Sequence, residues 1–135
     1  MAAGSSLGAA WAPRFLSVFR LVAGLMFLEH GTAKLLHFPY QASFAHLELF
    51  SRLGAAGAIE LVGGALVAVG LYTRAAAFIM SGEMAFAYFL AHAPRGFYPL
   101  LNGGEAAILY CFLFFYLFLA GGGPWSLDRL VRRIR

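Results

Sequence analysis

The 135 residues of this chain are too apolar and too weakly charged for an ordinary water-soluble domain, since 61% are hydrophobic, 12% are charged and the mean hydropathy is +0.76. The composition predicts a one-domain membrane protein that is surrounded by lipid and has no nucleic-acid partner. The single cysteine, Cys111, excludes an internal disulfide and multi-cysteine metal chemistry within one copy.

Residues 1–13 are small and uncharged, which predicts a flexible leader. A secretory signal is disfavoured, because ionisable residues closely follow the apolar run and no small-residue cleavage site is evident. Four apolar stretches of helical length follow, and they predict membrane spans over residues 15–37, 54–73, 75–93 and 103–121. A tight turn joins the second span to the third, so these two should be antiparallel neighbours. We therefore predict an all-α fold, an antiparallel four-helix transmembrane bundle.

The tail, residues 122–135, predicts a basic amphipathic helix after the glycines that end the fourth span. Its apolar face would consist of Leu127, Leu130, Val131 and Ile134, opposite four arginines. Such a helix suits the surface of anionic lipid, and docking of a partner protein is the alternative. An even number of spans puts both termini on the side that collects most basic residues, so we expect the N- and C-termini to be cytoplasmic.

The first span carries ionisable residues that a simple anchor would not need, namely Arg20, Glu29, His30 and Lys34. A charge in hydrocarbon is costly unless it faces the bundle interior, a partner or water, so each of these residues is a candidate for function. Helical spacing also predicts one polar, glycine-lined stripe that faces the interior of the bundle. It consists of Arg20, Gly24, Phe27, Gly31 and Lys34.

One glutamate falls on each span: Glu29, Glu60, Glu83 and Glu105. Counting the helical rise from the cytoplasmic ends puts Glu29, Glu60 and Glu105 at one level, about 21 to 24 Å deep. Glu83 lies deeper in this count, at about 13 Å, close to the level of Arg20. We therefore predict a structural ion pair between Arg20 and Glu83, with a proton path as the alternative.

Two of these glutamates have neighbours that bear on their role. Glu105 follows Asn102 at the spacing of a capping box, so helix capping and function are both open for it. Glu60 shares a helical face with Gly63 and Gly64, whose small size would let another helix approach beside it. We therefore expect Glu60 to take part in function.

These positions predict an outward-facing polar pocket between the first, second and fourth spans. Its catalytic residues would be Glu60, His30, Lys34 and Glu105. Lys34 would favour charged carboxylates while burial disfavours them, and such opposed effects suit proton transfer. A quinone or other flat redox lipid would bind through Glu29, Phe27, Phe112 and Tyr116, unless the aromatic rings only pack against lipid. No metal site is predicted, because the Glu-x-x-His pairs of di-iron bundles are absent.

Four motifs in order resemble the DoxX family of small four-helix membrane proteins. They are R-x3-G-x2-F-x2-H-G-x2-K from Arg20 to Lys34, IELVGGALVAVGLYTRAAA from Ile59 to Ala77, NGGEAA from Asn102 to Ala107 and GGGPWSLD from Gly121 to Asp128. His30, Lys34, Glu60 and Glu105 lie on motif positions, whereas Glu29 and Glu83 are not tied to the motifs.

The resemblance implies a multi-pass protein of the prokaryotic inner membrane. The family takes its name from a subunit of a thiosulfate:quinone oxidoreductase, and other members are associated with oxidoreductase assemblies. We therefore expect an accessory subunit that handles quinone or protons beside a redox partner subunit, and a homo-oligomer is open. A small-molecule transporter or exporter and a structural membrane anchor for a partner enzyme are the alternatives, and fold-level resemblance alone does not decide between them.

Overall fold

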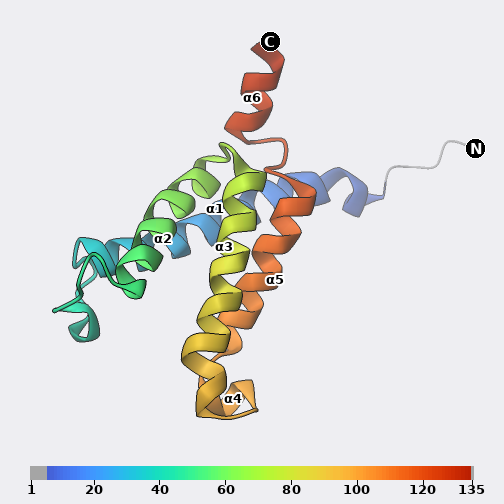
Figure 1. The fold of residues 1–135 in the computed structure, drawn as a ribbon. Helices are drawn as coiled ribbons and strands as arrows, with labels where there is room; N and C mark the ends of the chain where they lie inside the picture. The colour runs from blue at the N-terminus through green and yellow to red at the C-terminus, as the bar shows by residue number, and fades with distance from the viewer. Residues whose placement is uncertain (1–5, 135) are drawn as a thin grey trace, which may run out of the picture.

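The computed structural model describes residues 6–134, and every regular element in this part of the chain is a helix (Figure 1). The α-helices are α1 (Leu7–Leu35), α2 (Arg52–Val69), α3 (Thr73–Ala87), α4 (Pro99–Asn102), α5 (Glu105–Ala120) and α6 (Leu127–Ile134). The helical turns Tyr88–His92 and Ala93–Arg95 continue α3, and the short turn Ala42–Phe44 lies between α1 and α2. The prediction of an all-α fold is confirmed.

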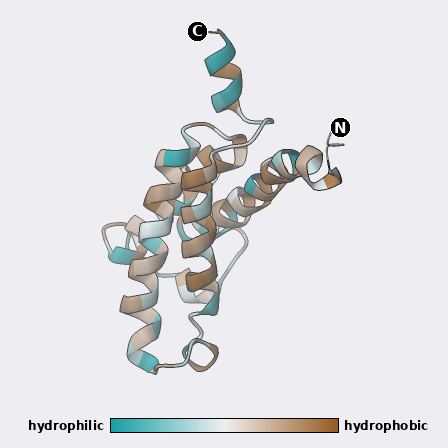
Figure 2. Ribbon diagram, turned by 90° about the vertical axis from the view of Figure 1, so that its right-hand side faces the viewer, coloured by the Kyte–Doolittle hydropathy of each residue, from teal (hydrophilic) through white to brown (hydrophobic). Residues whose placement is uncertain are grey.

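Among the described residues, three helical segments are long and apolar enough to cross a membrane: Leu7–Leu35, Arg52–Val69 and Thr73–Arg95. Helix α5 is apolar as well, but its 16 residues give it a length of only about 24 Å. The hydrocarbon core of a bilayer is about 30 Å thick. The long helices are largely hydrophobic, whereas α6 carries strongly hydrophilic residues (Figure 2).

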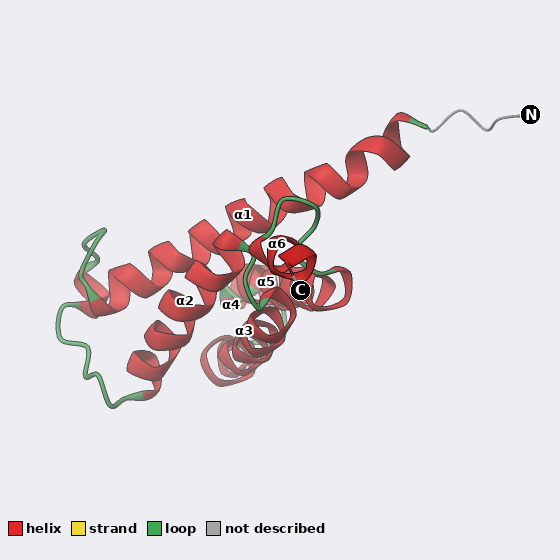
Figure 3. Ribbon diagram, turned by 90° about the horizontal axis from the view of Figure 1, so that it is seen from above, coloured by secondary structure: helices red, strands yellow, loops and turns green. Residues whose placement is uncertain are grey.

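The four long helices form two antiparallel pairs, α1 with α2 and α3 with α5. Helix α1 lies across α3 and α5 and does not run beside them, as the view from above makes clear (Figure 3). Helix α2 links the pairs, because it also packs against α3. The arrangement therefore differs from a bundle in which four helices run side by side.

Glycines bring α1 and α2 into backbone contact. A Cβ atom added to Gly64 would lie 2.5 Å from the backbone nitrogen of Leu28. A Cβ atom on Gly24 would collide with the backbone of Ala68, and one on Gly31 with the backbone of Leu61. No side chain fits at these positions, so the two helices approach as closely as small residues allow.

A cluster of aromatic rings joins the two helix pairs. The Phe27 ring is 1% exposed and meets the rings of Tyr110 and Phe114 edge to face, with centroids 4.9 and 4.6 Å apart. Such edge-to-face pairs stabilise beyond the area that they bury. Phe27 thus anchors α1 on α5 across the crossing of the pairs.

The buried guanidinium of Arg20 binds only backbone carbonyl groups. Its Nη1 donates to the carbonyl oxygens of Val67 (2.6 Å) and Ala68 (2.5 Å). Its Nε donates to Gly122 and its Nη2 to Trp125, each over 2.8 Å. Carbonyl groups at the end of a helix have spare acceptor capacity and carry partial negative charge, so a cation is well placed there. Arg20 thus ties the end of α2 to the segment that leads into α6.

The predicted ion pair between Arg20 and Glu83 is wrong. The guanidinium of Arg20 is satisfied by carbonyl groups, and neither carboxylate oxygen of Glu83 has a hydrogen-bond partner. The prediction rested on equal depth alone, and it overlooked the unpaired carbonyl groups that a helix end offers.

The base of α6 is fastened to the turn between α2 and α3. The carboxylate of Asp128 accepts hydrogen bonds from the backbone nitrogens of Tyr72 (2.7 Å) and Thr73 (2.9 Å). The backbone nitrogen of Asp128 in turn donates to the carbonyl oxygen of Gly70 over 2.8 Å. The predicted amphipathic tail helix is therefore present, and its first turn is held by the rest of the fold.

The predicted leader over residues 1–13 is helical from Leu7 onward, so a flexible segment of that length is wrong for residues 7–13. Three of these seven residues are alanines, the strongest helix formers. The Ser6 hydroxyl caps the helix by accepting from the backbone nitrogen of Ala9 at 3.3 Å. Residues 1–5 lie outside the described part of the chain.

We predict that Gly64→Ala lowers the free energy of unfolding by about 1 to 3 kcal/mol, because the new Cβ atom forces α1 and α2 apart. Thermal unfolding of the purified protein in mild detergent measures the effect. Gly82→Ala is the matched control, since a Cβ atom at Gly82 would meet nothing within 4 Å. Equal stability of the two variants would contradict the close helix contact.

A second prediction concerns Arg20→Lys, which keeps the charge but loses the planar fork that reaches two chain segments. We expect the free energy of unfolding to fall by about 3 kcal/mol and residues 122–126 to become sensitive to protease. Arg14→Lys should change stability by less than about 0.5 kcal/mol, because Arg14 is exposed and contacts only Ala10 and the Trp11 ring in its own helix. A tail that stays resistant to protease in Arg20→Lys would refute this role.

Candidate functional site

Lys34 and Glu60 form a buried ion pair between α1 and α2. The Nζ atom of Lys34 donates to both carboxylate oxygens of Glu60, over 2.5 and 2.6 Å. The residues are 8% and 3% exposed, and theirs is the only salt bridge in the region from residue 6 to residue 134. Two charges remain in a core of low dielectric constant only when their geometry compensates for the lost hydration.

Glycines also position this ion pair. Gly31 lies one turn before Lys34, and the backbone of Glu60 and Leu61 lies directly against it. On the facing helix, a Cβ atom at Gly57 would lie only 3.1 Å from the Cβ atom of Lys34. The two glycines therefore let the ends of these side chains meet over a short distance.

Glu83 on α3 is the third charged residue at this place. Both of its carboxylate oxygens are buried and have no hydrogen-bond partner in the part of the chain that the structure describes. Glu60 and Lys34 are the charged groups whose electrostatic fields act on it. The register of α2 and α3 supports this proximity, because one turn away on each helix Gly63 lies against the Met80 side chain. We call Lys34, Glu60 and Glu83 the buried triad.

Phe44 covers the Lys34 side of the triad. The Nζ atom lies 5.6 Å from the centroid of the Phe44 ring, a distance that suits a cation–π contact. Phe44 belongs to the short turn Ala42–Phe44. The connection between α1 and α2 therefore closes over the end of the ion pair.

The interior stripe predicted on α1 is confirmed. Each of its members is buried: Arg20, Gly24, Phe27, Gly31 and Lys34. The stripe faces α2 along most of its length, which is why the glycines and the lysine of α1 meet the glycines and the glutamate of α2.

The predicted pocket between the first, second and fourth spans is wrong in its composition. Glu105 is exposed at the first position of α5, and Glu29 and His30 are exposed on α1. Asn102 does not cap α5, because its side-chain oxygen accepts from the nitrogen of Gly104 at 2.8 Å. The charged site is instead built by α1, α2 and α3. The roles of these side chains in chemistry stay predictions.

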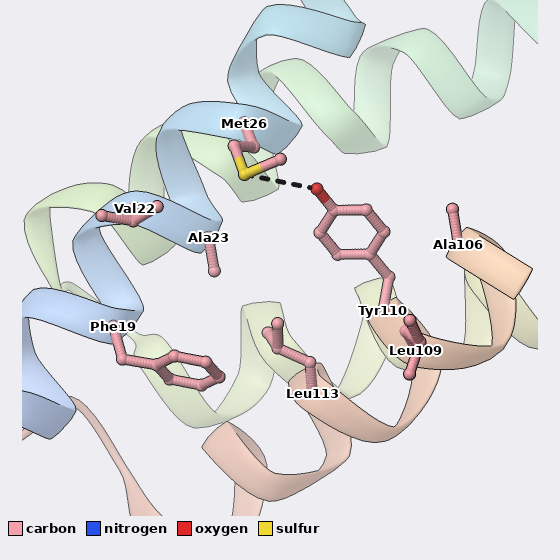
Figure 4. Close-up of a pocket in the computed structure, with 8 residues that line it drawn as sticks. All are labelled: Phe19, Val22, Ala23, Met26, Ala106, Leu109, Tyr110 and Leu113. Atoms are coloured by element: carbon pink, nitrogen blue, oxygen red, sulfur yellow. Dashed lines mark hydrogen bonds between the residues drawn. The ribbon is translucent and has the colours of Figure 1, made fainter.

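The aromatic residues predicted to bind a quinone do not gather around the triad. Phe27 is buried in the aromatic cluster, whereas Phe112 and Tyr116 are exposed. An apolar groove of about 320 Å³ lies elsewhere, between α1 and α5 (Figure 4). It is lined by Phe19, Val22, Ala23, Met26, Ala106, Leu109, Tyr110 and Leu113. The Tyr110 hydroxyl, which donates to the Met26 sulfur over 3.5 Å, is the side-chain hydroxyl among them.

Sequence reasoning missed Glu83 as the neighbour of Glu60, although the signal was present. Glu60 precedes Leu71 by 11 residues, and Glu83 follows Tyr72 by 11 residues. A tight turn at these two residues therefore brings the glutamates to the same height on antiparallel helices. A depth counted from Arg74 is misleading, because Arg74 lies on the α3 side of the turn. The count to Glu60 then includes the turn residues, and the count to Glu83 does not.

An all-helical chain with several membrane-length apolar helices and buried charges between them is a polytopic membrane protein. A family model described as DoxX matches residues 15–93, which include the whole triad. The chain belongs to the DoxX family.

Two relatives extend this assignment. An uncharacterised protein of Haemophilus influenzae is 48% identical over 120 residues, which cover 86% of this chain and 90% of the relative. An uncharacterised membrane protein of Mycobacterium tuberculosis is 29% identical over 133 residues, with coverage of 87% and 81%. No solved structure matches the chain.

We predict strong energetic coupling within the ion pair. Lys34→Met alone leaves a buried uncompensated carboxylate, and Glu60→Met alone leaves a buried ammonium group, so each should lower the free energy of unfolding by about 3 to 5 kcal/mol. The double variant replaces the pair by apolar side chains and should recover at least about 2 kcal/mol of the summed loss. Unfolding of all four proteins in detergent completes the cycle. Additive losses would show that the two charges do not depend on each other.

Proposed function

We propose that this protein is a multi-pass subunit of an oxidoreductase assembly in the prokaryotic inner membrane, and that its buried triad holds and passes on a proton. The observation that carries the proposal is the Glu83 carboxyl group, which is buried without a partner beside an ion pair. An ionised carboxylate without a partner is very costly in such a place, and the group becomes neutral instead. Glu83 would therefore carry the exchangeable proton.

The ion pair suits this role because it offers a second acceptor nearby. Glu60 is an acceptor for a proton that leaves Glu83, and Lys34 stabilises whichever of the two carboxylates is charged. The triad has no net charge when Lys34 is positive, one of the two carboxyl groups is protonated and the other is ionised. Ionisable groups buried between membrane helices commonly mark proton or substrate paths.

The orientation that we propose places the end with α6 in the cytoplasm. This end contains the turn between α2 and α3, the end of α5 and the base of α6. It also gathers the basic side chains of Arg74, Arg129, Arg132 and Arg133, and the positive-inside rule favours the cytoplasm for such an end. The short helix α5 would serve as a fourth span, because it packs along α3.

Binding of a quinone is a separate proposal. The groove between α1 and α5 is apolar enough for an isoprenoid chain, yet no triad residue lines it. The expected proton partners and the apolar groove thus lie apart, and the fit to a quinone ring beside the triad is poor. The redox chemistry would belong to the partner subunit.

Glu83→Gln tests the proton role, because the amide keeps the shape of the side chain but cannot release a proton. We expect the wild-type protein in liposomes at neutral pH to show the infrared carbonyl band of a protonated carboxylic acid. The variant should lack this band. In host membranes that contain the variant as the only copy, activity of the assembly should fall about tenfold or more at equal protein level.

Glu48→Gln is the matched control, since Glu48 is exposed in the connection between α1 and α2. It should keep both the infrared band and the activity. A band that persists in Glu83→Gln would show that another group holds the proton. Unchanged activity in Glu83→Gln would separate the triad from the redox assembly.

A further inference from the structure

Helix α6 extends beyond the other helices while its base is fixed to them. In Figure 1 it stands apart from the long helices, at the end where α2 meets α3. Asp128 holds its first turn. Trp125, which lies just before the helix, is held by Arg20 at its carbonyl oxygen and by Ser17 at its backbone nitrogen. The helix therefore has a defined place next to α2.

Both faces of α6 lack partners within the described residues. Leu130 is 53% exposed and Ile134 78% exposed. None of the guanidinium groups of Arg129, Arg132 and Arg133 makes a hydrogen bond or a salt bridge in the described part of the chain. Figure 2 shows strongly hydrophilic and hydrophobic residues on the same short helix. An anion together with an apolar group would satisfy both faces.

A hollow of about 280 Å³ lies between α6 and the end of α2. Arg129 and Arg133 both line it, because residues four apart lie on one face of a helix. Its other lining residues are mostly apolar and include Val69, Trp125 and Leu130. Arg132 is not among the lining residues.

We propose that this hollow binds the headgroup of an anionic phospholipid, with Arg129 and Arg133 on the phosphate and the start of an acyl chain against Val69 and Leu130. Paired guanidinium groups match a phosphate in charge and geometry. Tryptophan favours the boundary between headgroups and hydrocarbon, which suits Trp125 at the rim. A free phosphate would leave the apolar part of the hollow uncovered. This inference does not depend on the proposed proton role.

Trp125 serves as the reporter in the test. Trp11→Phe leaves it as the single tryptophan, since the chain has two. The full chain is placed in nanodiscs of phosphatidylcholine and phosphatidylglycerol, and either one lipid or the other carries brominated acyl chains. Quenching of Trp125 by each lipid gives their relative affinity for the hollow. We expect phosphatidylglycerol to be preferred by about 30-fold at low salt, or about fivefold for each arginine.

Single substitutions that each remove one positive charge locate the site. Arg129→Gln and Arg133→Gln should each reduce the preference about fivefold, whereas Arg132→Gln should change it less than about twofold, since Arg132 does not line the hollow. These exposed side chains make no contacts that the fold requires. Equal losses in all three variants would mean that α6 attracts lipid only through its total charge and would overturn the site.

Two further arms separate the lipid from other anions. Inorganic phosphate at millimolar concentration should leave the preference for phosphatidylglycerol unchanged, and so should a short polyglutamate peptide. Displacement by phosphate would assign the hollow to a free anion, and displacement by the peptide would assign it to an acidic protein segment. Either result, or equal quenching by both lipids in the Trp11→Phe protein, would refute the proposal.

Discussion

Two opposite charges, on Lys34 and Glu60, are buried between α1 and α2, and neither could remain there without the other. Their distance is set by the backbones, because glycines at residues 24, 31 and 64 bring the backbones of the two helices into contact. The ion pair and the glycine contact therefore depend on each other. A wider separation of α1 and α2 would break the pair. Loss of one partner would leave the other charge buried without compensation.

At the opposite end of the same helices, a buried cation is stabilised by backbone carbonyl groups and not by a carboxylate. There Arg20 is buried as deeply as Glu60, at 3% exposed, yet no carboxylate among residues 6–134 pairs with it. Backbone carbonyl groups at the end of α2 and before α6 accept all of its hydrogen bonds. Helix ends leave such groups unpaired and carry partial negative charge. The cation thus costs little there and in return connects α1, α2 and the tail.

The sequence was sufficient for the helices, for the stripe on α1 and for the amphipathic tail, because each depends on local periodicity. It was not sufficient for partners, which depend on register between helices. Depth alone predicts a pair of Glu83 with Arg20, whereas the turn at Leu71 and Tyr72 places Glu83 beside Glu60. Depth along the helices predicts Glu105 at the level of Glu60, yet it is exposed at the start of α5. Carbonyl acceptors for Arg20 leave no mark in the sequence at all.

The contrast between satisfied and unsatisfied charges indicates where function should be sought. Arg20, Lys34 and Glu60 each have partners that account for their burial. The burial of these residues is therefore explained without any chemistry, so burial by itself does not assign them a function. Among the acidic residues between positions 6 and 134, Glu83 is the one whose carboxylate oxygens are buried without a hydrogen bond that would explain its presence in α3. An apolar residue would be more stable at this position. A carboxyl group that weakens the fold and lies within the electrostatic field of an ion pair is the group whose chemistry the protein has reason to keep.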